Sequence, residues 1–133
     1  MAAGEIEKSE KITVNLGPVD LGQIDLLVAE GFYANRTDFI RSAIRAQLAT
    51  RAAAVDQTVA RRTLTLGTLS LTRRELEELA RDGRTVEIRV LGLATIAPDV
   101  SPELALATIS AVEVLGAFRA SPAVKAALAP RTV

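Results

Sequence analysis

The sequence predicts an α+β protein built from two dissimilar halves. A short strand pattern and two helix patterns occupy the first third, and a strand–helix motif recurs three times in the second half. Hydrophobic residues make up 49% of the 133 residues, which favours packed globular units over a disordered chain. We therefore predict a flexible tail over residues 1–10, a strand–helix–helix unit over 11–50, a helical connector over 51–62 and a repeat domain over 63–133.

The strand pattern is the segment Lys11–Leu16, where polar and apolar residues alternate strictly. Successive side chains of a strand point to opposite faces, so the segment has one apolar and one polar face. Gly17-Pro18 is expected to end the strand. The apolar face carries Ile12, Val14 and Leu16, and the polar face carries Lys11, Thr13 and Asn15.

Two amphipathic helix patterns follow the strand. The first covers about Leu21–Glu30, with Asp20 as the expected N-cap and Gly31 after its last turn. The second begins after Asn35, which we expect to cap the helix with Asp38 as its acidic partner three residues on. Its apolar stripe can continue past residue 50, so residues 51–62 are predicted to be a helical connector.

The second half contains an internal repeat anchored on Gly67, Gly92 and Gly116. A leucine precedes each of these glycines, and another leucine follows each glycine twelve residues later. Each copy is predicted to form a short strand, then the glycine, a second extended segment and a helix capped by Thr72, Ser101 or Ser121. Three copies of about 24 residues predict a small, solenoid-like α/β domain with stacked parallel strands, although a chance alignment within an ordinary α/β domain is the alternative. The predicted helices are Arg73–Arg81, Pro102–Ile109 and Pro122–Ala129.

Composition excludes several kinds of chemistry. The chain has no histidine and no cysteine, so the usual ligands of zinc and of other transition metals are missing, as are Ser–His and Cys–His nucleophilic pairs. We expect no enzymatic activity, no metal and no cofactor. The sequence shows neither a signal peptide nor an apolar stretch that could span a membrane, so we expect a cytoplasmic protein. The 16 basic and 16 acidic residues balance, which counts against an extensive basic face for nucleic acid.

The order of strand, helix and helix over Lys11–Leu48 resembles the ribbon–helix–helix family of DNA-binding proteins, of the Arc, MetJ and CopG type. The resemblance rests on the alternating strand and on the segment Asn35–Arg45, with a polar, a basic, a hydroxyl and an acidic residue before an apolar pair. It implies a homodimer in which two strands pair as an antiparallel ribbon. A lone strand with two amphipathic helices also leaves strand edges and apolar faces unsatisfied, which independently favours pairing of two chains.

A two-stranded ribbon fits the major groove of double-stranded DNA, where its outward side chains read base edges. We therefore expect Lys11, Thr13 and Asn15 to contact bases. The first turn of the second helix presents free backbone N–H groups, so we expect Asn35, Arg36 and Thr37 to hold a DNA phosphate.

The predicted function is that of a sequence-specific transcriptional regulator, expected to act as a repressor. Residues 63–133 offer no ligand site, and Glu75, Glu77 and Glu78 are expected to form an ion-paired surface with neighbouring arginines. We expect this domain to join protomers into a higher-order homo-oligomer. Two alternatives remain open: an antitoxin of a toxin–antitoxin pair, and a scaffolding protein whose repeat domain polymerises.

Overall fold

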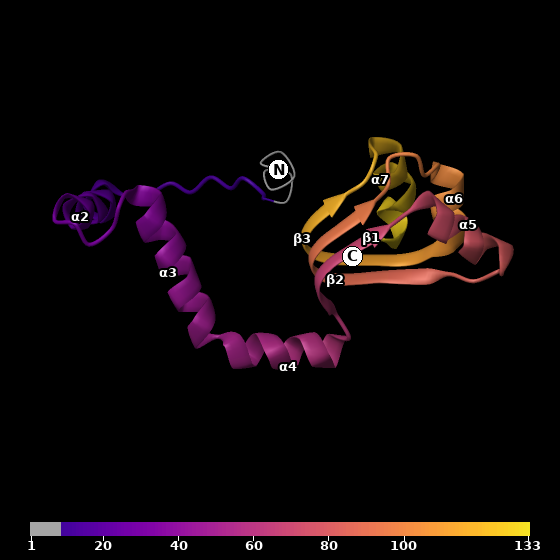
Figure 1. The fold of residues 1–133 in the computed structure, drawn as a ribbon, viewed down its shortest axis with the longest axis horizontal. Coiled ribbons are helices and arrows are strands. Elements are labelled where there is room, and N and C mark those ends of the chain that lie inside the picture. The colour runs from indigo at the N-terminus through magenta and orange to yellow at the C-terminus, as the bar shows by residue number, and fades with distance from the viewer. Residues whose placement is uncertain (1–8) are drawn as a thin grey trace. The chain divides into compact units, whose positions relative to one another are not determined.

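The computed structural model of the chain describes residues 9–133, and the predicted tail lies largely outside this range (Figure 1). The fold is α+β, with helices throughout and one three-stranded parallel sheet that does not close on itself. The chain divides into two compact units, Ser9–Gln57 and Thr58–Val133. Each unit is described separately below.

The first unit is a helix pair, α2 (Pro18–Ala29) and α3 (Arg36–Thr50). The first helix starts earlier than the sequence predicted, because Pro18 occupies its first position and Gly17 is the N-cap. Proline is favoured there, since its missing N–H would have no helical partner. The predicted capping role of Asp20 is therefore wrong, and Asp20 lies in the first turn. Gly31 follows the helix with a φ of +86° and donates its N–H to Val28 O, as predicted.

The predicted strand Lys11–Leu16 is not a strand in the single chain. Among residues 9–133 it has no ladder partner, and every residue in the segment is exposed. A strand is defined by hydrogen bonds to a neighbouring strand, and the described part of the chain supplies none for this segment. Ile12 is 75% exposed and Val14 is 67% exposed, so the apolar face of the segment is uncovered.

The connector is helical, as predicted, but it is a separate helix, α4 (Ala52–Arg62). Helix α3 ends at Thr50, because the φ of −109° at its C-cap residue Arg51 departs from helical geometry. At the other end of α4, the Arg62 guanidinium lies 3.0 Å from the Glu113 carboxylate in the sheet. Arg62 and Glu113 both belong to the second unit, so this ion pair holds the last turn of α4 against the sheet within that unit.

The second unit alternates strands and helices along the chain, with the strands in the order β1-β2-β3 and all parallel. A 3₁₀ turn, η1 (Ala129–Arg131), closes the chain, and the next residue, Thr132, bridges to Val112 beside β3. The elements are β1 (Thr65–Leu71), α5 (Arg73–Arg81), β2 (Val86–Ile96), α6 (Pro102–Thr108), β3 (Ile109–Arg119) and α7 (Pro122–Leu128).

The register of the sheet pairs Gly67 with Gly92 and Gly92 with Gly116, the three glycines aligned in the sequence. All three have φ between +123° and +139°, which glycine adopts easily and other residues do not. A Cβ atom at Gly92 would overlap the carbonyl oxygen of Gly67, and one at Gly116 would overlap that of Gly92. Glycine is therefore required at Gly92 and Gly116. Strands β2 and β3 each bend along their length (Figure 1).

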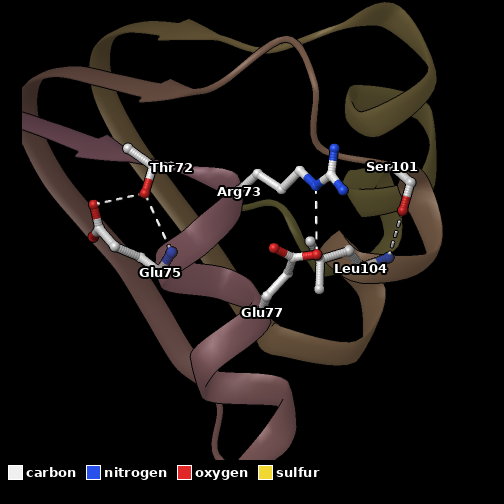
Figure 2. Close-up of polar contacts among 6 residues, drawn as sticks. All are labelled: Thr72, Arg73, Glu75, Glu77, Ser101 and Leu104. Atoms are coloured by element: carbon white, nitrogen blue, oxygen red, sulfur yellow. Dashed lines mark hydrogen bonds and ion pairs between the residues drawn. The ribbon is translucent and has the colours of Figure 1, made fainter.

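The helices of the second unit start at the predicted caps. Thr72 accepts a hydrogen bond from the Glu75 N–H, and Ser101 accepts one from the Leu104 N–H (Figure 2). Ser121 caps α7 in the same way through the Val124 N–H. The core lies between these helices and the sheet, and its largest fully buried side chains include Leu76, Ile88, Ile109 and Leu128.

Candidate nucleic-acid interface

The predicted base-reading residues lie on the segment before α2. Lys11, Thr13 and Asn15 are all exposed, as are the apolar residues between them. Alternating residues share one face when a segment is extended. Figure 1 shows the segment before α2 without helical coiling, as this arrangement requires. The segment is therefore available to pair with another chain.

The predicted phosphate-holding residues meet at the start of α3. Asn35 caps the helix, because its side-chain oxygen accepts the Asp38 N–H at 2.8 Å. The Asp38 carboxylate in turn accepts the Ala34 N–H at 2.9 Å. The sequence predicted that Asn35 and Asp38 form a reciprocal cap of this type. In the structure the Asp38 carboxylate accepts the backbone N–H of Ala34 and not that of Asn35.

The cap leaves two backbone donors at the positive end of the helix. Within residues 9–133, no hydrogen bond to the N–H of Arg36 or Thr37 is formed, and both residues are exposed. Unpaired N–H groups in the first turn, together with the helix dipole, favour an anion. The geometry at this end of α3 is therefore suited to a phosphate oxygen.

The Arg36 side chain has a partner that the sequence did not reveal. Its Nε donates to Asp25 Oδ1 and its Nη2 donates to Asp25 Oδ2, both at 2.8 Å. This hydrogen-bonded pair lowers the pKa of the Asp25 carboxyl and raises the pKa of Arg36. Asp25 lies on α2, so the pair ties the start of α3 to the preceding helix through Nε and Nη2 of Arg36, and Nη1 takes no part in it.

The helix pair buries very little of its own apolar surface. Ile24 is the only buried residue among residues 9–57, and the Tyr33 and Phe39 rings meet edge to face at 5.0 Å. The apolar stripe of α3 is uncovered, and six further large apolar side chains of this unit are also exposed. A folded unit of this size normally has a core, so this surface is suited to a partner. The exposed stripe of α3 consists of Ile40, Ile44 and Leu48.

Charged residues of the second unit lie on the exposed surface of helix α5. Arg73 pairs with Glu77 one turn away on α5, as Figure 2 shows, and Arg74 pairs with Glu78 in the same way. The predicted ion-paired surface is therefore formed by Glu77 and Glu78, whereas Glu75 accepts a hydrogen bond from the Thr72 hydroxyl. Over residues 9–133, no group of carboxylates is placed to hold a metal ion. In the same range, no helix combines the length and the apolar character needed to cross a bilayer.

The helix pair, the alternating segment before it and the open N-terminus of α3 are features of a DNA-binding regulator. Comparison with protein-family models matches residues 7–125 to the Ribbon-Helix-Helix transcriptional regulator family, and the chain belongs to this family. The match covers nearly the whole chain, well beyond the first third on which the sequence resemblance rested. The family is one of DNA-binding regulators and not of enzymes. No curated protein and no solved structure matches the chain.

Proposed function

We propose that the protein is a dimeric, sequence-specific regulator that reads the major groove of double-stranded DNA with a ribbon made from two copies of residues 11–16. The observation that carries the proposal is the uncovered apolar surface of the helix pair, in which Ile24 alone is buried. Two copies that interlock their helices beneath a shared ribbon remove this surface from water. Each large apolar side chain buried in this way contributes about 1.5–3 kcal/mol.

In the proposed ribbon, the exposed segment gains backbone hydrogen bonds along one edge and a cover for its apolar face. Antiparallel pairing of two segments satisfies their backbone hydrogen bonds, and the apolar face with Val14 then lies against the helices. The polar face points outward twice, once from each chain. Lys11 can donate to guanine, Asn15 can pair with adenine, and Thr13 can contact a base edge or a thymine methyl group.

The start of α3 positions the ribbon on the duplex. The N–H groups of Arg36 and Thr37 hold one phosphate, and the Thr37 hydroxyl and Nη1 of Arg36 add to the contact. The Asn35 side chain contributes indirectly, because its oxygen already holds the helix cap. Such contacts fix orientation, while the ribbon discriminates between sequences.

The second unit serves assembly. Three parallel strands, each followed by a helix and aligned on equivalent glycines, support the interpretation as a strand–helix repeat domain. Repeat domains without polar capping units expose surfaces at their ends that other protomers can cover. We propose that this unit links protomers of a cytoplasmic repressor on neighbouring DNA sites.

A salt-titrated DNA-binding assay tests the proposal. Duplexes selected from genomic DNA by the purified full-length chain serve as the probe, with a scrambled duplex for comparison. Asn15→Ala and Lys11→Ala should each weaken binding to selected duplexes by roughly 1–3 kcal/mol and bring it closer to binding of the scrambled duplex.

Lys125→Ala is the matched control for Lys11→Ala, because Lys125 is an exposed lysine of the second unit. It should leave binding unchanged. The proposal fails if the wild type does not prefer selected over scrambled duplexes. It also fails if Asn15→Ala and Lys11→Ala retain the full preference.

A further inference from the structure

No strand among residues 9–133 pairs with the outer edge of β1. Strand β1 ends the sheet, and its backbone hydrogen bonds within residues 9–133 lead only to β2 and, at Leu71 O, to the Ala97 N–H. Five of its seven residues are exposed, and Leu66 is 63% exposed. An open edge presents unpaired N–H and C=O groups that can pair with another strand.

The edge of β1 also lacks the features that normally prevent such pairing. The strand Thr65–Leu71 contains no charged residue and no proline. Natural edge strands are usually protected by lysine, proline, a bulge or a covering segment. The opposite edge strand, β3, differs because it carries Glu113 and Arg119 and is partly covered by residues after α7.

Gly67 shows how closely another strand could approach this edge. The space where a Cβ of Gly92 would lie is filled by the carbonyl of Gly67, and the equivalent space at Gly116 is filled by the carbonyl of Gly92. At Gly67, whose φ is similar, the equivalent space is empty. The backbone at Gly67 is therefore open to close approach by a further strand.

A parallel sheet that continues from β3 of one copy to β1 of the next is obstructed at β3. Thr132 bridges to Val112, and Val133 donates its N–H to Val112 O, so these residues occupy the β3 edge at that point. An incoming β1 in the repeat register would place its preceding residues, Thr63 and Leu64, in the same space. The edge of β1 has no such obstruction.

We infer that β1 pairs antiparallel with β1 of a second copy of this chain, across a twofold axis. Such an interface is self-complementary and closed, and an uncharged strand places no like charges opposite each other. If all seven residues overlap, Thr68 lies at the centre and faces its own copy. This inference rests on the assembly role proposed above and specifies the surface that performs it.

Single-cysteine variants test the pairing, because the chain contains no cysteine. Opposed residues of paired strands bring their Cβ atoms within the reach of a disulfide. Oxidised full-length T68C should therefore migrate as a covalent dimer. A117C is the matched control, since Ala117 occupies the same row of the sheet on β3, and it should remain a monomer on a denaturing gel.

Amide exchange gives a second measurement that does not require a disulfide. Outward amides of β1 should be protected in the wild type, and T68K should raise their exchange rates by about tenfold or more, because it sets two lysines opposite each other. A117K should leave these rates unchanged.

The pairing is overturned if T68C stays monomeric while the outward amides of β1 exchange freely in the wild type. It is also overturned if A117C cross-links as readily as T68C. DNA binding is measured on the same proteins. Cross-linking without DNA binding would reject the regulator function alone, and DNA binding without pairing of β1 would reject this inference alone.

Discussion

The Asp25 carboxylate on α2 and the Arg36 guanidinium at the first position of α3 meet through two hydrogen bonds of 2.8 Å each. Both side chains are about half exposed, so the pair contributes little to the stability of the fold and mainly fixes the position of the two helices relative to each other. Its position matters because Arg36 also bears one of the two free N–H groups at this helix end. We expect Asp25 to act as a positioning residue that fixes how α3 presents these groups to DNA.

The pair predicts an altered titration of Asp25. Because Arg36 hydrogen-bonds to the ionised carboxylate, the pKa of Asp25 lies below its ordinary value. The stabilisation is present above the unfolded pKa and is lost as the pH falls through the lower folded pKa, that is, below about pH 4. Arg36→Gln should raise the pKa of Asp25 toward its ordinary value, as measured by NMR of the carboxyl carbon. Arg41→Gln should leave it unchanged, and an Asp25 titration that Arg36→Gln does not alter would refute the pairing.

Dimerisation through the helix pair predicts a strong effect of Ile44→Lys. Ile44 lies in the exposed stripe of α3, and the dimer loses about 1.5–3 kcal/mol for each of its two copies. Amides of α3 should then exchange rapidly, and DNA binding should be lost. Ala46→Lys is the control, because Ala46 lies about 200° around the helix from Ile44. Retained protection of α3 in Ile44→Lys would contradict the proposed dimer.

The cap at the start of α5 predicts that Thr72→Ala lowers the free energy of unfolding more than Arg73→Gln does. Thr72→Ala removes the acceptor of the Glu75 N–H and should lower the free energy of unfolding by about 0.5–2 kcal/mol. Arg73→Gln removes only an exposed ion pair with Glu77, one turn away, and should cost no more than about 0.5 kcal/mol. Urea unfolding of the full chain distinguishes the two variants. Equal losses would mean that the cap in Figure 2 contributes little.

The glycine row predicts a difference between two similar substitutions. Gly67→Ala introduces a side chain at a φ of +124° but meets no atom within 4 Å in the single chain, so backbone strain of about 1–3 kcal/mol is its expected cost. Gly92→Ala adds an overlap with the Gly67 carbonyl and should lose a further ~1–3 kcal/mol. The comparison is made by chemical unfolding, and a smaller loss for Gly92→Ala would refute the close approach of β1 and β2.

Local features of this protein were predictable from the sequence. The caps at Asn35, Thr72 and Ser101 were identified correctly, because each depends on a hydrogen bond to a residue three positions away. Asp20 was assigned wrongly because Gly17-Pro18 was interpreted only as the end of the strand, whereas proline at the first helical position also favours an earlier start of the helix. The alignment of Gly67, Gly92 and Gly116 agrees with the register of the sheet.

The sequence by itself determined where the helices of the second unit begin and which glycines lie side by side, since capping and repeat spacing are written in neighbouring or regularly spaced residues. Only the tertiary structure decided that Arg36 is held by Asp25, eleven residues away, because that contact depends on how α2 packs on α3. The structure likewise decided that Lys11–Leu16 has no partner within residues 9–133. A strand requires hydrogen bonds from a second strand, and alternation alone cannot supply them.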